Sequence, residues 1–173
     1  MHRSRRQREA NLLGVLALEV AGRVTAATSE AASLGAAAPA AIAALQLYPG
    51  CTIEELRRVI GLSQPGAVRL VDRLQSTGVV ERRAGRDGRT VALELTDDGA
   101  ATARRILEAR LRAVDDVLAV LDDDGRRALE PLLERLVGSL AADRAEARRV
   151  CRLCDVDACG HPERCPITQA VHG

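Results

Sequence analysis

The stretch that decides the fold is residues 49–96, PGCTIEELRRVIGLSQPGAVRLVDRLQSTGVVERRAGRDGRTVALELT. Thr52 followed by Glu55 forms the capping-box pattern, in which a hydroxyl and a carboxylate accept hydrogen bonds from unpaired amides at a helix N-terminus. The apolar residues that follow recur at three- and four-residue spacing, which predicts a short amphipathic helix. Gly61 ends this helix.

A second helix is predicted immediately after the turn at Gly61-Leu62. Ser63 can cap its N-terminus, and Pro65 lies in its first turn, where a missing amide proton costs little. Its apolar back is predicted to consist of Val68, Val71 and Leu74. Its front combines small residues with long hydrogen-bond donors: Gln64, Gly66, Ala67, Arg69 and Arg73. Such a narrow, polar front suits a helix that enters the major groove of double-stranded DNA.

The remainder of the stretch predicts a β-hairpin. Gly78 stops the second helix, one strand begins at residues 79–83, and the chain returns at residues 90–96. The turn between them contains Asp87-Gly88, a strong hairpin signal. Six arginines (69, 73, 82, 83, 86 and 89) face three acids between residues 63 and 89, so this surface is predicted to be basic although the whole chain carries a net charge of only +1. A locally basic surface favours binding to phosphates.

Helix, turn, helix and basic hairpin in this order resemble the MarR-type winged helix-turn-helix transcriptional regulators. The resemblance covers roughly residues 9–146 and rests on these segments: residues 52–56, 61–63, 68–74 and 78–82, Asp87-x-Arg89, and Leu95-Thr96-x-x-Gly99. It implies an obligate homodimer, often a repressor, that binds a pseudo-palindromic operator and is released by a small molecule, a metal or an oxidant.

The same resemblance implies roles for individual residues. Ser63, Gln64 and Arg69 would meet bases or phosphates and Arg73 a phosphate, while Asp87 would brace Arg89 as the wing enters the minor groove. The full set of expected DNA contacts is Ser63, Gln64, Ala67, Arg69, Arg73, Arg86, Asp87 and Arg89. Two features depart from the family: aromatic residues are almost absent, and a cysteine cluster follows the usual last helix.

The predicted fold class is mainly α with a small β-hairpin wing. The chain has 173 residues, of which 47% are hydrophobic, enough for a real core. Four regions are expected: an N-terminal dimerisation helix (1–36), the winged helix-turn-helix (37–99), C-terminal dimerisation helices (100–147) and a cysteine-rich metal-binding tail (148–173).

Dimerisation is predicted from apolar stripes in the flanking helices. The stripes alternate steps of three and four residues: Leu107, Leu111, Val114, Leu118 and Leu121 in one helix, and Leu129, Leu133, Leu136 and Leu140 in the next. Together with the N-terminal helix they are expected to interdigitate with a second chain.

No apolar run appears long enough to cross a membrane, and the start of the chain does not resemble a signal peptide, so a cytoplasmic protein is expected. The sequence also lacks a Ser/His/Asp set, a phosphate-binding glycine loop and a His-Glu helix motif, and an enzyme is therefore not expected.

The tail carries little helical pattern and contains the motif Cys151-x2-Cys154-x4-Cys159-x5-Cys165-Pro166. Disulfides are disfavoured in the cytoplasm, whereas closely spaced thiolates bind metal ions. Zinc is the preferred interpretation, with His161 either beside the ligands as a hydrogen-bond partner or as a substitute for Cys159 or Cys165. An iron-sulfur cluster and a set of redox-active thiols are the alternatives. Two further functions stay open: a metal- or redox-responsive sensor, and a metal-stabilised protein-interaction module.

Overall fold

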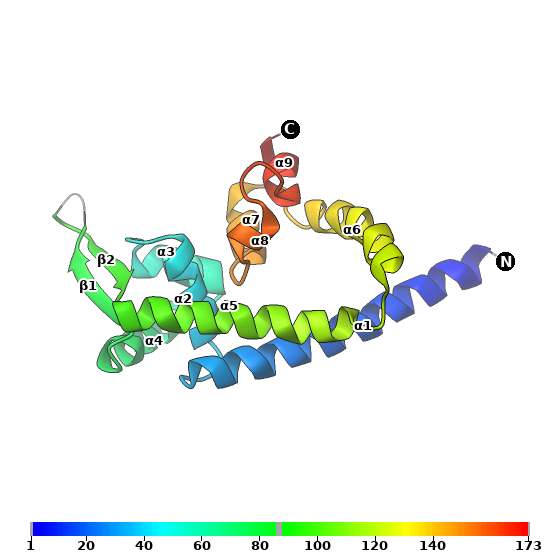
Figure 1. Ribbon diagram of the computed structural model, residues 1–173. Coiled ribbons are helices and arrows are strands. Elements are labelled where there is room, and N and C mark those ends of the chain that lie inside the picture. The colour runs from blue at the N-terminus through cyan, green and yellow to red at the C-terminus, as the bar shows by residue number, and fades with distance from the viewer. Residues whose placement is uncertain (1, 86–87, 173) are drawn as a thin grey trace.

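A computed structural model of the protein describes residues 2–85 and 88–172, and Figure 1 shows its path. The elements of the described residues are α1 (His2–Ala32), α2 (Ala38–Leu47), α3 (Ile53–Ile60), α4 (Gln64–Ser76), β1 (Val80–Ala84), β2 (Val91–Leu95), α5 (Asp97–Leu118), α6 (Asp123–Gly138), α7 (Arg144–Val150), α8 (Val156–Cys159) and α9 (Pro166–His172). The expected fold class, mainly helical with one hairpin, is confirmed.

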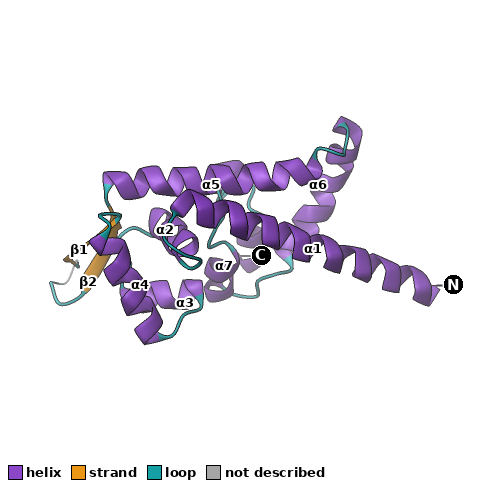
Figure 2. Cartoon of the chain, turned by 90° about the horizontal axis from the view of Figure 1, so that it is seen from below, coloured by secondary structure: helices purple, strands orange, loops and turns teal. Residues whose placement is uncertain are grey.

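Two long helices, α1 and α5, lie side by side and form the spine of the molecule (Figures 1 and 2). One end of α5 carries α2, α3, α4 and the hairpin, which we call the head. The other end leads to α6. The last three helices, α7 to α9, form the tail, in which α7 contacts α3 and α9 contacts α6. The tail therefore bridges the head and the α6 end of the spine.

The head is built as its local sequence predicts. The Thr52 hydroxyl accepts the amide of Glu55 at 3.2 Å, and the Glu55 carboxylate accepts the amide of Thr52 at 2.8 Å. Gly61 ends α3 with φ of 74°, a left-handed conformation that glycine adopts without a steric penalty. The Ser63 hydroxyl then caps α4 by accepting the Gly66 amide at 3.3 Å. Each turn of the helix-turn-helix is thus set by side chains within a few residues of it.

One hydrophobic core lies beneath the head and joins it to the spine. Its largest fully buried side chains come from five elements: Ile42, Leu45, Leu56, Leu74, Leu93 and Ile106. A β-bridge between Cys51 and Leu93 attaches the start of the helix-turn-helix to β2. The head and α5 are therefore packed as one unit.

Two expectations about the rest of the chain are wrong. Residues 148–173, expected to carry little helical pattern, contain the end of α7 and the short helices α8 and α9, and Asp155 caps α8. The expectation that no apolar run could cross a membrane also fails on length and composition. Ser4–Ala32 within α1 has a mean hydropathy of 1.3 over its best window, of which 6% is buried. One such helix near an N-terminus is weak evidence for a membrane span, and packing against a partner gives the same pattern.

The hairpin and α5 meet at one tight junction. Thr96 caps α5 by accepting the Gly99 amide at 3.0 Å, and its hydroxyl donates to the Gly78 carbonyl at 2.6 Å. A Cβ atom at Gly99 would lie only 2.0 Å from the Val79 carbonyl oxygen. Because that oxygen belongs to the backbone, only glycine allows this approach.

We therefore expect Gly99→Ala to lower the free energy of unfolding by about 1 to 3 kcal/mol, as an overpacked site does. Helix propensity alone would favour alanine by about 1 kcal/mol, so the sign of the change is diagnostic. Gly22→Ala in α1 is the control, since among the described residues no atom beyond the neighbouring backbone of its own helix lies within 4 Å of the added Cβ. Urea unfolding of both variants checks the prediction, and equal stability of Gly99→Ala and wild type would contradict the junction.

Candidate functional site

The exposed side of α4 carries the polar residues expected on its front, with one correction. Gln64, Arg69 and Arg73 are exposed, but Ala67 is completely buried (0% exposed) and packs inward with Leu70, Val71 and Leu74. The expected DNA contact by the Ala67 side chain is therefore wrong. The sequence predicted an inward face of Val68, Val71 and Leu74. The helix instead buries residues 67, 71 and 74, so this face lies closer to Ala67.

The other predicted residues in and beside α4 differ in the contacts that they make within the protein. Ser63 uses its hydroxyl oxygen in the helix cap. The Arg73 guanidinium reaches the Leu34 carbonyl oxygen at 3.5 Å, at the connection between α1 and α2. Among the residues that the structure describes, Arg69 has no hydrogen-bond or ion-pair partner. In that part of the chain, Arg69 is thus a cation of α4 that no contact holds to the protein.

Two arginines of the wing hold the wing itself together. Arg82 of β1 pairs with Asp72 of α4 at 2.5 Å and also donates to Gln75, which ties the hairpin to α4. Arg83 pairs with Glu81 at 2.5 Å and with Glu94 of β2 at 3.2 Å. The sequence interpretation counted both arginines in a surface for phosphates and missed these pairings. Strand alternation could have suggested the cross-strand contact, but no spacing rule links α4 to β1.

The turn of the wing is only partly described. Arg86, which was expected to contact DNA, and Asp87, which was expected to brace Arg89, lie outside the described residues. Arg89 is exposed just after the turn. The proposed bracing of Arg89 by Asp87 therefore stays a prediction.

The Asp72–Arg82 pair should be measurable as a coupling between α4 and the wing. A double-mutant cycle with Asp72→Ala and Arg82→Ala is expected to give about 0.5 to 1 kcal/mol, the upper range for partly exposed pairs, because the Arg82 side chain is only 30% exposed. The matched control is Asp124 with Arg127 in α6, whose side chains are 88% and 72% exposed, and which should give a coupling near zero. Equal couplings in both pairs would show that Arg82 does not tie the wing to α4.

The second candidate site is the cysteine cluster of the tail. Cys165 is buried beside Ala141 and Ile167, and Cys151 and Cys159 pack against the same small apolar cluster. Cys154 joins through a turn in which its amide donates to the Cys151 carbonyl at 2.8 Å. All five cysteines of the chain lie in the described residues and none forms a disulfide. The tail fold thus collects four thiols, while Cys51 lies apart in the head.

The thiols influence one another. A hydrogen bond between Cys151 and Cys154 lowers the pKa of Cys151 and raises that of Cys154. Burial, reinforced by Cys154 and Cys165, raises the pKa of Cys159 to about 12. Burial acts in the same direction on Cys165, but hydrogen bonds with Thr168 and His161 outweigh it and bring its pKa to about 7. The predicted ligands are therefore neighbours, and His161 stands beside one of them.

The four thiols are neighbours without being arranged around one point. Within the described residues, no three Cys, His, Asp or Glu side chains are placed to hold a metal ion as they stand. The structure brings Cys151, Cys154, Cys159 and Cys165 together but shows no coordination geometry. The zinc and iron-sulfur assignments both stay predictions.

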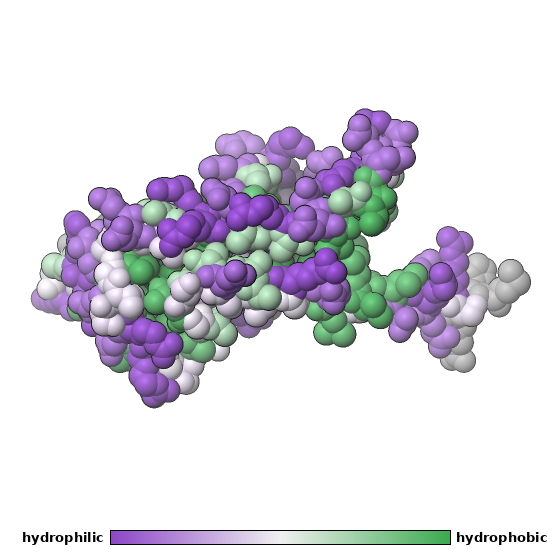
Figure 3. Space-filling model, turned by 60° about the horizontal axis from the view of Figure 1, so that its bottom comes forward, coloured by the Kyte–Doolittle hydropathy of each residue, from purple (hydrophilic) through white to green (hydrophobic). Residues whose placement is uncertain are grey.

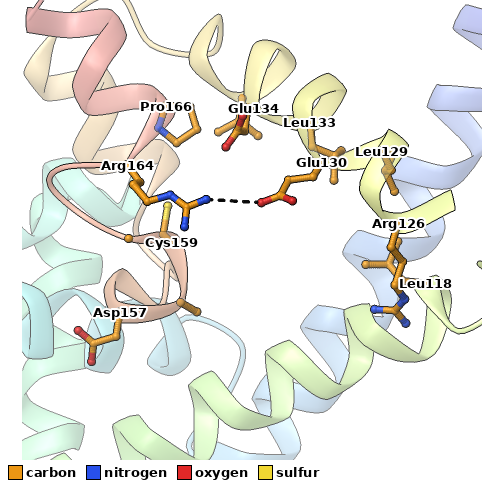
Figure 4. Close-up of a pocket in the computed structure, with 13 residues that line it drawn as sticks. Leu118, Arg126, Leu129, Glu130, Leu133, Glu134, Asp157, Cys159, Arg164 and Pro166 are labelled. Carbon is orange, nitrogen blue, oxygen red and sulfur yellow. Dashed lines mark ion pairs between the residues drawn. The ribbon is translucent and has the colours of Figure 1, made fainter. Parts of the chain in front are cut away.

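Several pockets border the tail, among them two that lie against its cysteines. One of about 520 Å³ lies between α6 and the α8 region, where Arg164 and Glu130 point toward one another and form an ion pair of 3.8 Å (Figure 4). Another of about 340 Å³ is lined by Tyr48 and Arg148 together with Cys151, His161 and Cys165. Both volumes fall in the range of about 300 to 1,000 Å³ that small ligands occupy. The expected small-molecule effector stays a prediction.

Fold and surface together define a winged helix-turn-helix protein: a capped two-helix unit, a hairpin tied to its second helix, and long helices beside it. Residues 34–90 match the model of the MarR family. This match covers the helix-turn-helix and the first strand of the wing, in agreement with the sequence resemblance, and the cysteine cluster lies outside it.

Individual relatives agree with this assignment. The uncharacterized HTH-type transcriptional regulator YwhA of Bacillus subtilis is 25% identical over 90 residues, which cover 51% of this chain and 65% of YwhA, slightly less than two thirds of that relative. The crystal structure of YusO from Bacillus subtilis has a TM-score of 0.66 at 17% identity, covering 79% of this chain and 97% of YusO, and supports the fold alone. A cysteine-to-serine mutant of MarR from E. coli, complexed with operator DNA, has a TM-score of 0.54 at 26% identity and covers 75% of this chain and 96% of that protein.

Proposed function

We propose that the protein is a transcriptional regulator that binds a pseudo-palindromic DNA operator as a homodimer, and that it acts as a repressor. The observation that carries the DNA-binding proposal is exposed Arg69, without a partner among the described residues, beside exposed Gln64 on α4. The complex of the MarR mutant with operator DNA supports it, because that protein shares this fold at 26% identity. In such folds the second helix of the unit enters the major groove.

The proposed contacts differ in what they do. Gln64 and Arg69 lie within the first two turns of α4, the part of a recognition helix that meets base edges. Bidentate arginine and glutamine contacts discriminate guanine and adenine from other bases. Ser63 and Arg73 lie at either side of them and are assigned to phosphates, and exposed Arg89 is assigned to the wing contact. Arg82 and Arg83 position the wing instead of binding DNA.

Arg69→Ala should weaken binding to an operator selected from a random duplex pool by about 1 to 3 kcal/mol, or roughly 5- to 150-fold, if Arg69 contacts a base. A phosphate contact would instead lower affinity evenly across sequences and reduce the salt slope by about one. Fluorescence anisotropy titrations at several salt concentrations separate the two results. The control is Arg127→Ala, which removes an equal charge from the exposed face of α6. Unchanged affinity and slope in Arg69→Ala would contradict the assignment of α4.

Exposed apolar residues on the flanking helices support the homodimer. They are Leu12, Leu13, Val15, Leu16 and Leu18 on α1, and Leu132, Leu133 and Leu136 on α6. In Figure 3 hydrophobic residues gather where α1 extends beyond the rest of the molecule. All of α6 is described, and none of its residues is buried. A second copy that packs against both helices would cover these side chains, as interdigitated helices of dimers do.

Leu16→Glu combined with Leu136→Glu should convert a dimer into a monomer at micromolar concentration, because charges would enter the apolar interface. Sedimentation velocity measures the change. Val91→Glu is the matched control: Val91 of β2 is 47% exposed, as against 48% for Leu16 and 50% for Leu136, yet lies on the wing. A wild-type protein that sediments as a monomer at this concentration would contradict the proposal.

The dimer also accounts for the hydropathy of α1. A helix of this length and composition fits a membrane span as well as an interface. Sedimentation velocity and membrane fractionation distinguish a dimer interface from a membrane span. With DNA as the partner, we assign the protein to the cytoplasm.

A further inference from the structure

The tail is ordered around thiols and has little else to order it. The buried residues of its apolar cluster are Ala141, Cys165 and Ile167, and the partly buried ones beside them include Cys151 and Cys159. A cluster of this size offers little hydrophobic stabilisation to three short helices, since small cores rarely suffice without a cross-link. The side chains at its centre are themselves potential metal ligands.

Local turns bring Cys151, Cys159 and Cys165 to this cluster, and a turn holds Cys154 beside Cys151. Asp155 caps α8 by accepting the amides of Asp157 and Ala158 at 3.1 and 3.0 Å. Gly160 follows with φ of 70°, and a Cβ there would lie 2.9 Å from the Cβ of Arg164. This tight turn brings the chain back so that Cys165 lies with Cys159. The backbone thus presents two pairs of cysteines to one another through capped turns.

The tail is also attached to the head through side chains of α7 and of the turn that follows it. The Arg148 guanidinium lies 4.8 Å from the centre of the Tyr48 ring at the end of α2. Leu153, between Cys151 and Cys154, packs against the core of the head. Tyr48, Arg148 and Cys151 line one pocket. Any change that orders or releases the cysteine turn therefore acts directly on the support of α2 and α3.

We propose that Cys151, Cys154, Cys159 and Cys165 bind one zinc ion, and that the metal-bound tail supports the head through Arg148 and Leu153. Four thiolates complete a tetrahedron and leave no open position, so the site is structural. On metal binding each thiol would give its proton to solvent and become a thiolate ligand. His161, which accepts or donates a hydrogen bond with Thr168 at 3.1 Å, stands beside Cys165 and would orient that ligand.

The metal content of the intact protein tests the ligand set. Protein purified anaerobically and without chelator should contain about one zinc per chain by elemental analysis and show no visible colour. Cys154→Ser and Cys165→Ser should each lose this zinc, whereas Cys51→Ser, which removes the cysteine of the head, should keep it. Cobalt(II) added to chelator-treated protein should restore binding with the visible absorption of a thiolate complex. Iron with inorganic sulfide, protein without metal, or equal loss in Cys51→Ser would each overturn the assignment.

Tyr48 provides a readout of tail docking that does not depend on DNA. It is the only tyrosine, and the chain has no tryptophan, so tyrosine fluorescence reports on the ring beneath Arg148. Chelation of wild-type protein should change this emission and increase cleavage of the tail by an arginine-specific protease at least about tenfold. Arg148→Ala should keep the zinc but already show the altered emission. Unchanged emission and cleavage after metal removal would show that the metal does not order the tail.

The effect on operator affinity rests on the proposed DNA-binding function and is measured separately. Metal removal should weaken operator binding several-fold if the tail, by supporting α2 and α3, helps to hold α4 in position. Zinc occupancy with no DNA binding under any condition would sink the regulator and leave the metal site standing. If wild-type protein without metal is well folded and binds DNA, the metal site is overturned and the proposed regulator stands.

Discussion

The junction of Thr96 and Gly99 with the Gly78–Val79 turn constrains the arrangement of the whole molecule. The end of α4, both strands of the wing and the start of α5 all meet there, within hydrogen-bond distance of one another. Because Gly99 lacks a Cβ, α5 can begin directly against the Val79 carbonyl. The direction of the spine is thereby fixed relative to the helix proposed to read DNA, and a shift of either would be transmitted to the other.

The composition of the chain explains why the spine is incomplete alone. Phe and Trp are absent and Tyr occurs once, so the core is filled by alanine and branched aliphatic side chains. Small side chains let α1, α2 and α5 approach closely, but a pair of long helices covers only one side of each. The leucines of α1, and Leu132, Leu133 and Leu136 of α6, are exposed in a single chain. Burying them requires another apolar surface, which the second copy in the proposed dimer would provide.

The arginines show how one residue type is divided between structure and recognition. Arg82 and Arg83 are held by carboxylates of α4 and the hairpin, and Arg148 lies over Tyr48. Arg69 stays available in the described part of the molecule. A count of charges cannot separate these roles, since a paired arginine contributes little to the field that a phosphate meets.

The sequence by itself determined the local structure: the capping box at Thr52, the turn at Gly61, the hairpin, and hence the winged helix-turn-helix class. These features depend on residues within a few positions of each other, and therefore a pattern can specify them. It did not determine the burial of Ala67, the Asp72–Arg82 pair or the helices of the tail packed against Tyr48. Rotation of α4 about its axis, and contacts between elements far apart along the chain, follow from how side chains share one core. Only the tertiary structure decides that packing.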